Sequence, residues 1–250
     1  MVATTVHLMR HGEVHNPEGV LYGRLPGYRL SERGRAMARM VAAHLSGRQY
    51  EGAWLSELGH DDAAADAVVA AAPQAAGASP VIGPRRDVVA VIASPLERAQ
   101  ETAAPIAAAF GLEVGTDPRL IEAENHFQGM TFGVGDGSLR HPQHWPHLRN
   151  PFRPSWGEPY RVQVERMLAA VADAREAARG HEVVLVSHQL PVWVTRLALE
   201  NRRLWHDPRR RHCSLASLTS LRYEDDALVS ITYTEPAAAL LPGAATVAGA

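Results

Sequence analysis

Apolar side chains are concentrated in three short runs that read as β-strands. Residues 4–8 show the polar–apolar alternation of a strand, while residues 87–93 and 182–186 are nearly continuous runs rich in β-branched residues. Continuous runs of this length are typical of strands that are buried on both faces of a parallel sheet. The pattern therefore predicts an α/β protein in which these three runs belong to one largely parallel sheet.

Helical spacing of apolar residues separates these strands. Helices are predicted over residues 31–45, 94–110, 160–179 and 191–199. For the second helix we expect Ser94 as the N-cap, Pro95 at the first helical position and Glu97 completing a capping box. Near the C-terminus the alternation returns over residues 216–223 and 228–234, which predicts a hairpin at the sheet edge.

Three segments lack this regular pattern. Residues 51–86 combine an acidic patch with Ala- and Pro-rich sequence, and we interpret them as a surface insertion with a short helix over 63–72. Residues 125–158 are rich in His, Trp and Arg and are predicted to form a lid or pocket wall. Residues 236–250 are rich in Ala, Pro and Gly and are predicted to be a disordered tail. The rest, residues 1–235, is expected to be a single domain.

Composition narrows the classes of function. The formal net charge is −2, so no global basic field predicts binding to nucleic acid or to an anionic membrane. Cys213 is the single cysteine, which excludes an intramolecular disulfide and a thiolate metal site. No signal-peptide pattern and no apolar run long enough for a membrane span is present. We therefore expect a cytoplasmic enzyme or binding protein.

Basic side chains follow each of the three predicted strands. Arg10 and His11 follow the first, Arg98 lies in the helical turn after the second, and His188 follows the third. The carboxyl ends of parallel strands are where open α/β sheets place their ligands. Any one of these side chains alone would be an ordinary surface or core residue. Together they predict a compact cationic pocket.

This set of side chains fits phosphoryl transfer through a histidine. Two guanidiniums can hold phosphoryl oxygens bidentately without losing their charge. A neutral His11 whose second ring nitrogen donates to a carbonyl can attack phosphorus, and a protonated His188 could stabilise the equatorial oxygens. The leaving alcohol needs a proton from a carboxylic acid with a raised pKa, for which Glu122 and Glu124 are the alternatives. This scheme requires no metal and no other cofactor.

The motifs of this chain resemble those of a known family. Five stretches occur in the order seen in the histidine phosphatase superfamily, which has the phosphoglycerate-mutase-like fold: Arg10-His11-Gly12-Glu13, the loop and helix start from Gly23-Arg24 to Gly34, Ser94-Pro95-Leu96-Glu97-Arg98, Leu120-Ile121-Glu122 and Val186-Ser187-His188. The resemblance covers roughly residues 3–234, apart from the insertion. It implies a three-layer α/β/α sandwich with a mixed, mainly parallel central sheet. The oligomeric state stays open, because family members occur as monomers, dimers and tetramers, and a homodimer is among the expected forms.

The resemblance also implies residue roles. It implies His11 as the nucleophile, Arg10 and Arg98 as phosphate clamps, His188 as the second histidine and Glu122 as the proton donor. Asn16, Arg24 and Gln189 are added as candidate substrate-binding residues beside the clamps and His188. The substrate is expected to be a small phosphorylated molecule.

Departures from the family pattern favour a phosphatase over a mutase. Asn16 lies six residues after Arg10, where mutases tend to carry an Asn at seven, and Gln189 stands where many members have glycine. The alternatives are therefore a phosphoglycerate-mutase-type transferase and, from another class, a non-catalytic protein that binds phosphorylated ligands. A zinc hydrolase built from the histidines of residues 125–158 is disfavoured, because their spacing matches no ordered ligand set.

Overall fold

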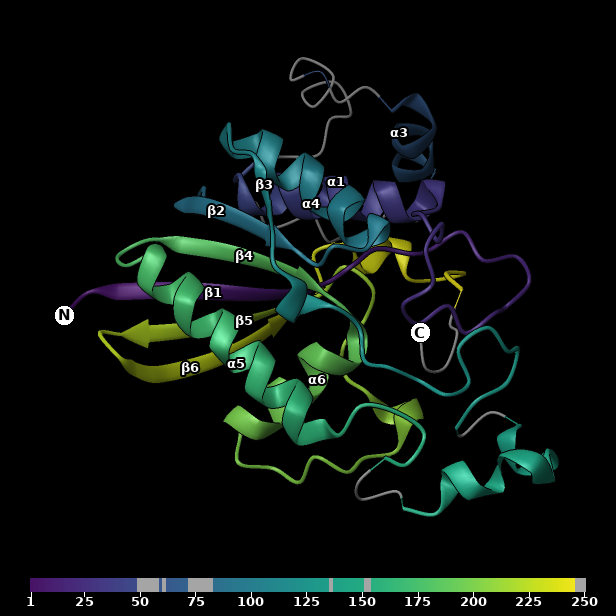
Figure 1. The fold of residues 1–250 in the computed structure, drawn as a ribbon. Helices are drawn as coiled ribbons and strands as arrows, with labels where there is room; N and C mark the ends of the chain where they lie inside the picture. The colour runs from purple at the N-terminus through teal and green to yellow at the C-terminus, as the bar shows by residue number, and fades with distance from the viewer. Residues whose placement is uncertain (49–58, 60–61, 72–82, 135–136, 151–153, 246–250) are drawn as a thin grey trace.

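The computed structural model describes residues 1–48, 59, 62–71, 83–134, 137–150 and 154–245. Its centre is a six-stranded sheet with the order β3-β2-β4-β1-β5-β6 (Figure 1). The strands are β1 (Ala3–Arg10), β2 (Val88–Ala93), β3 (Val114–Thr116), β4 (Glu182–Ser187), β5 (Leu218–Glu224) and β6 (Ala227–Thr234). β3, β2, β4 and β1 are parallel, while β5 is antiparallel to both of its neighbours. The predicted mixed, mainly parallel sheet and its edge hairpin are confirmed.

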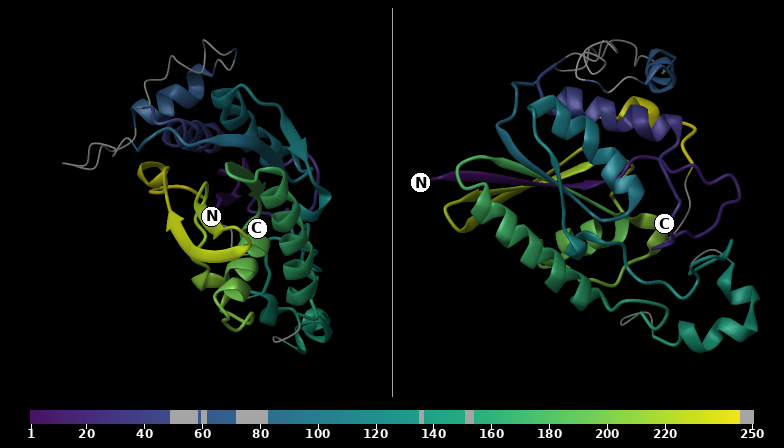
Figure 2. Two further views of the ribbon diagram at one scale, coloured as in Figure 1. Left: turned by 90° about the vertical axis from the view of Figure 1, so that its left-hand side faces the viewer. Right: turned by 45° about the horizontal axis from the view of Figure 1, so that its top comes forward.

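Helices cover both faces of this sheet. The helices are α1 (Glu32–Leu45), α3 (Ala63–Ala70), α4 (Glu97–Phe110), α5 (Tyr160–Ala177) and α6 (Gln189–Leu199). Figures 1 and 2 show α1 and α4 on one side of the sheet and α5 and α6 on the other. The predicted three-layer α/β/α sandwich is confirmed, and the bounds of the predicted helices agree with the structure within a few residues.

Alternation along the central strands divides the apolar core in two. Met9, Val184 and Val186 pack with the inner faces of α1 and α4, whereas Leu8 and Leu185 pack with α5 and α6. Successive side chains of a strand point to opposite faces, so a strand between two helical layers must be apolar at nearly every position. This explains the continuous apolar runs in the sequence.

The register of the sheet brings the ends of three strands together. Arg10 pairs with Ser187, and Ala93 pairs with Val186. The ladder continues one residue beyond the strands, because the His11 amide donates to the Ser187 carbonyl at 3.1 Å. Residues that follow β1, β2 and β4 therefore meet at one edge of the sheet.

Helix α4 does not begin as predicted. Its N-cap is Leu96, whose side chain makes no capping hydrogen bond, and the helix starts at Glu97. The hydroxyl of Ser94 lies instead 2.8 Å from Nε2 of His188. The expected capping box from Ser94 to Glu97 is thus wrong, because a contact with another strand end takes the place of the local cap. By contrast, Ser31 caps α1 as expected and accepts from the Gly34 amide.

The part of the insertion that the structure describes packs on α1. The short helix predicted there is present as α3, and Asp62 and Asp66 at its start pair with Arg35 and Arg39 of α1. The predicted acidic patch is therefore partly neutralised by ion pairs to the domain. Most of residues 51–86 lie outside the described residues.

Residues 236–245 correct the expectation of a disordered tail. They form a short 3-10 helix, Ala238–Leu240, in which Leu240 is buried. Ala237 and Leu240 belong to the same apolar cluster as the inner faces of α1 and α4. Further along, the Ala245 amide donates to the Glu13 carboxylate at 2.7 Å. The tail contains few large apolar residues, so its composition did not predict that Ala237 and Leu240 are buried. The last five residues of the predicted tail, 246–250, lie outside the described part of the chain.

Removing the apolar anchor of this tail should destabilise the domain. Leu240→Ala is expected to lower the free energy of unfolding by roughly 2–3 kcal/mol, because the leucine is almost fully buried and its loss leaves a cavity. Leu139→Ala is the control, since Leu139 is 74% exposed and its truncation should change stability by no more than about 0.5 kcal/mol. Urea unfolding of both variants measures the difference. Equal stabilities would show that the tail is not docked in solution.

Short 3-10 helices occur in the connecting segments. They are η1 (Pro118–Leu120), η2 (Ser138–Arg140), η3 (Pro142–Leu148), η4 (Pro208–Arg210) and η5 (Ala238–Leu240).

None of the helices in the described ranges combines the length and apolar character needed to cross a bilayer.

Candidate active site

Four of the predicted side chains meet where the parallel strands end. Arg10 ends β1, His11 follows it, Arg98 lies in the first turn of α4 and His188 is the N-cap of α6. His11, Arg98 and His188 are completely buried, and Arg10 is 7% exposed. The imidazole centroids of His11 and His188 are 5.1 Å apart. The strand register explains this convergence, since each residue lies at or just beyond a paired strand end.

Backbone hydrogen bonding orients His11. Its Nδ1 lies 2.7 Å from the carbonyl oxygen of Gly12, and this contact fixes Nδ1 as the protonated nitrogen. Nε2 therefore carries the lone pair, and Nε of Arg98 donates to it at 3.3 Å. The turn is tight: a Cβ on Gly12 would lie 2.5 Å from the carbonyl oxygen of Gly34 at the start of α1. Glycine at position 12 lets the loop pass close to the helix.

The two guanidiniums are held by backbone carbonyls. Arg98 donates through Nη2 to the Gly23 carbonyl at 2.6 Å, and its guanidinium lies 4.7 Å from the centroid of the Tyr22 ring. Arg10 donates through Nη1 to the Cys213 carbonyl at 2.9 Å. Carbonyls orient both cations, and an aromatic face also contacts Arg98. The site consequently keeps a strong attraction for an anion.

Burial and the two arginines keep both histidines neutral. The pKa of His11 lies well below its ordinary value because of burial, with the charges of Arg98 and Arg10 adding to the effect. The pKa of His188 is also lowered well below its ordinary value, first by burial and then by Arg98. A neutral His11 suits a nucleophile. The lowered pKa of His188 argues against the protonated form that the sequence predicted.

The imidazole of His188 makes one hydrogen bond within the protein. Its Nε2 contacts the Ser94 hydroxyl, while its buried Nδ1 has no hydrogen-bond partner among the described residues. With Ser94 donating to Nε2, the neutral tautomer carries its proton on Nδ1 and can donate it to a bound oxygen. Sequence analysis missed Ser94 in this role because its position also fits a helix cap.

Between the two alternative acids, the geometry favours Glu122. Glu122 is 5% exposed, and burial raises the pKa of its carboxyl group, although the Ala123 amide and Arg98 act in the opposite direction. The side chain of Glu124 is 70% exposed and forms an ion pair with Arg24. A proton donor at neutral pH needs a raised pKa, and burial gives Glu122 this property.

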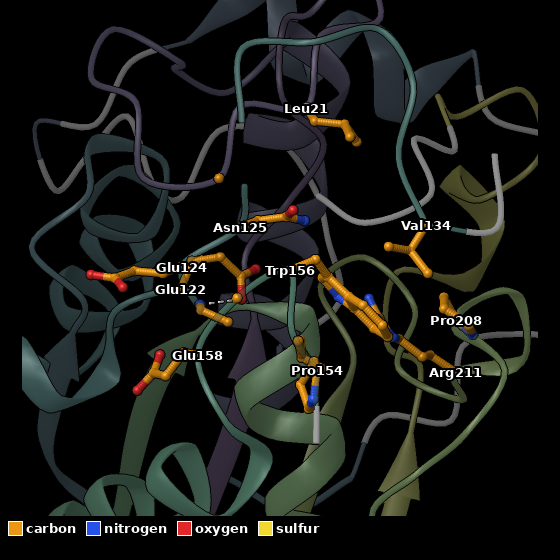
Figure 3. A pocket seen from close by; sticks show the side chains of 14 residues that line it. Leu21, Glu122, Glu124, Asn125, Val134, Pro154, Trp156, Glu158, Pro208 and Arg211 are labelled. Carbon is orange, nitrogen blue, oxygen red and sulfur yellow. Dashed lines mark hydrogen bonds between the residues drawn. The ribbon is translucent and has the colours of Figure 1, made fainter. Parts of the chain in front are cut away.

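Glu122 lines a pocket next to the predicted lid segment (Figure 3). Backbone hydrogen bonds join residues 124–126 to residues 156–158 and thereby bring Trp156 to the pocket wall. Arg211 also lines this pocket, and in the view of Figure 3 Trp156 is drawn between Glu122 and Arg211. The described ends of the predicted lid thus form part of the wall beside the acid.

The histidines of the lid contact one another away from the Glu122 pocket. His126 stacks on His147 with ring centroids 3.6 Å apart, and its Nε2 lies 3.1 Å from Nδ1 of His144. Phe132 stacks on His141. Within the described ranges, no group of three His, Cys, Asp or Glu side chains is arranged to hold a metal ion.

Two of the predicted substrate-binding residues, Asn16 and Arg24, have partners within the protein. The Asn16 amide bonds to the backbone of Val20 and closes its own loop. Arg24 donates to the Glu122 carbonyl and pairs with Glu124 and Glu158, so carboxylates already match its charge. Both side chains therefore have partners within the protein, and their contacts with substrate stay predictions.

Gln189 also has partners within the protein. Its Nε2 donates to the Cys213 carbonyl at 3.4 Å, and its Oε1 accepts from Arg211 at 3.2 Å. Its side chain is thus linked to Arg211, and its role in substrate binding stays a prediction. Arg211 belongs to a run of three arginines, in which Arg211 turns inward while Arg209 and Arg210 are exposed beside Asp207. No local pattern distinguishes the third arginine from the first two.

Comparison with known proteins agrees with this geometry. The model of the histidine phosphatase superfamily (branch 1) matches residues 6–74 and 70–235. A Mycobacterium tuberculosis protein named uncharacterized protein Rv0525 is 54% identical over 235 residues, covering 94% of this chain and 98% of its own length.

Solved structures share the fold at low sequence identity. A phosphoserine phosphatase from Entamoeba histolytica, in complex with 3-phosphoglyceric acid, aligns with a TM-score of 0.64 at 16% identity and covers 94% of this chain and 99% of its own. A mycobacterial glucosyl-3-phosphoglycerate phosphatase, Rv2419c, aligns with a TM-score of 0.60 at 22% identity, covering 93% and 96%.

Proposed function

This chain belongs to the histidine phosphatase superfamily, and on that premise we propose that it is a metal-independent phosphomonoester hydrolase acting through a phosphohistidine on His11. The observation that carries the proposal is the state of His11. It is neutral, its Nδ1 is engaged by a carbonyl, and its Nε2 faces the guanidinium of Arg98. This is the arrangement that a nitrogen nucleophile toward phosphorus requires.

The first half-reaction transfers the phosphoryl group to the enzyme. Arg10 and Arg98 bind the phosphoryl oxygens, and Arg98 exchanges its hydrogen bond to His11 for one to the substrate. Nε2 of His11 then forms a bond to phosphorus while the ester P–O bond breaks. His188 donates from Nδ1 to an equatorial oxygen, and Glu122 gives its proton to the leaving alcohol oxygen.

The second half-reaction restores the enzyme with water. The Glu122 carboxylate accepts a proton from a water molecule, whose oxygen attacks phosphorus as the bond to Nε2 breaks. Inorganic phosphate leaves, and Glu122 is protonated again for the next cycle. One carboxyl group thus acts first as acid and then as base, which its raised pKa allows.

Hydrolysis of an aryl phosphate in the presence of a chelator tests this proposal. We expect para-nitrophenyl phosphate to be hydrolysed at the same rate with and without excess EDTA. Rapid quench in alkaline detergent with ³²P-labelled substrate should trap protein-bound phosphate that is stable to base and labile to acid, as a phosphohistidine is. Activity that EDTA abolishes and added metal restores would overturn the proposal. If labelled enzyme returns its phosphoryl group only to an added phosphoglycerate, the protein is a mutase.

A further inference from the structure

Arg211 lies between two cavities of the site. It lines the Glu122 pocket together with Trp156 (Figure 3). It also lines a larger cavity of about 510 Å³, which Arg10 lines as well. Because Arg10 is one of the two arginines assigned to the phosphoryl group, any part of a substrate that extends from that group into the larger cavity meets Arg211.

Two neutral side chains hold Arg211 in place. Its Nε donates to Nε2 of His206 at 3.0 Å, and its Nη1 donates to Oε1 of Gln189 at 3.2 Å. Nδ1 of His206 lies 2.7 Å from the carbonyl oxygen of Leu204, so Nε2 is left as the acceptor. Burial lowers the pKa of His206 to about 4, which keeps the imidazole uncharged at neutral pH. The guanidinium is therefore oriented but not neutralised.

No carboxylate pairs with Arg211 among the described residues. Other arginines near the site have such partners: Arg24 pairs with Glu124 and Glu158, and Arg209 pairs with Asp207. Glu122 is the acidic group that acts most strongly on Arg211, but it forms no ion pair with it among the described residues. A partly buried cation without a directly paired carboxylate is costly unless a ligand supplies one. Nη2, which makes no hydrogen bond within the described part of the chain, is available to such a ligand.

A short hydrogen-bonded chain links Arg211 to the phosphate clamp. Gln189 contacts Arg211 through Oε1 and the Cys213 carbonyl through Nε2, and the same carbonyl accepts from Nη1 of Arg10. The side-chain amide of Gln189 and the carbonyl of Cys213 therefore set the separation of the Arg211 and Arg10 guanidiniums. That separation suits a substrate in which only a few carbons join the phosphoryl group to a second anionic group.

From this arrangement we propose that Arg211, oriented by His206 and Gln189, is a binding subsite for an acidic group on the alcohol portion of the substrate. The preferred substrates are then small phosphomonoesters with a second anionic group, either a carboxylate or another phosphate. This inference rests on the proposed hydrolase function and specifies its substrate class. It makes Arg211 a specificity-determining residue that has no part in the chemical step.

A matched series of three-carbon esters provides the test. The probes are propyl phosphate, 3-(phosphonooxy)propanoate and propane-1,3-diyl bisphosphate, which differ only in a terminal methyl, carboxylate or phosphate group. We expect wild type to hydrolyse at least one acidic ester with a kcat/KM about tenfold or more above that of propyl phosphate, as a charge-assisted contact implies. The two acidic probes separate a carboxylate subsite from a phosphate subsite.

Variants of adjacent arginines complete the experiment. Arg211→Gln should remove the preference for the acidic esters while kcat/KM for propyl phosphate changes by less than about threefold. Arg211→Lys should keep part of the preference, because it retains the charge without the fork of donors. Arg210→Gln is the control, since that side chain is 87% exposed and should leave all three values unchanged.

Two results would overturn the subsite. One is a wild type that does not distinguish the acidic esters from propyl phosphate. The other is an Arg211→Gln variant that loses activity equally on all three, which would place Arg211 in the common chemical step. If wild type hydrolyses none of them, the proposed hydrolase fails independently. Calorimetric binding of the same probes to wild type and Arg211→Gln then decides the subsite alone.

Discussion

His11→Ala is expected to lower kcat for every phosphomonoester by at least about 10⁴-fold, because the bond to phosphorus forms at Nε2 of His11, the nitrogen that faces the Arg98 guanidinium. The trapped phosphoenzyme should disappear in the same variant. Steady-state hydrolysis of para-nitrophenyl phosphate and the alkaline-quench assay measure the two effects independently.

A loss of activity must be separated from a loss of structure, because His11 is completely buried. His15→Ala is the matched control, since this exposed histidine lies four residues further along the same loop and should keep wild-type activity. Calorimetry with inorganic phosphate should show that His11→Ala still binds the anion through Arg10 and Arg98. Full activity in His11→Ala would make the central assignment wrong.

Glu122→Gln is expected to slow hydrolysis of alkyl phosphates by about 10²- to 10⁴-fold, the usual contribution of a general acid. The effect on kcat/KM for para-nitrophenyl phosphate, which reports only the phosphorylation step, should be much smaller, because that leaving group departs without a proton. Glu124→Gln is the control and should change both rates little, since Glu124 is exposed and paired with Arg24. The ratio of alkyl to aryl kcat/KM in the two variants measures the effect. Equal losses in both variants would leave the acid unassigned.

The pH dependence of kcat/KM follows from the same groups. Phosphorylation needs neutral His11 and protonated Glu122. The lowered pKa of His11 places the acid limb below the ordinary range of histidine, while the raised pKa of Glu122 moves the alkaline limb above the ordinary range of a carboxyl group. Activity on alkyl phosphates should therefore fall as pH rises through the Glu122 pKa, and Glu122→Gln should lack this alkaline limb.

Local patterns were sufficient for the framework of this protein. The nearly continuous runs ending at Ala93 and Val186 could only be strands between two helical layers, and such strands end together at one edge of the sheet. The positions of Arg10, His11, Arg98 and His188 next to strand ends therefore already predicted a common site. Ser31 and Gly111 likewise marked helix ends through short-range hydrogen bonding and backbone conformation.

Only the tertiary structure decided which polar side chains pair within the protein and which are left for a ligand. Glu122 and Glu124 are equivalent in sequence, but Glu122 is buried, which raises the pKa of its carboxyl group, whereas Glu124 is exposed and paired with Arg24. Arg24 and Arg211 are both plausible anion ligands, yet carboxylates from distant segments pair with the first and not with the second. Ser94 has the sequence context of a helix cap, but its hydroxyl forms a hydrogen bond with His188 instead. Each of these outcomes depends on contacts between residues far apart in the chain, where burial and countercharge are set, and a local pattern contains no information about them.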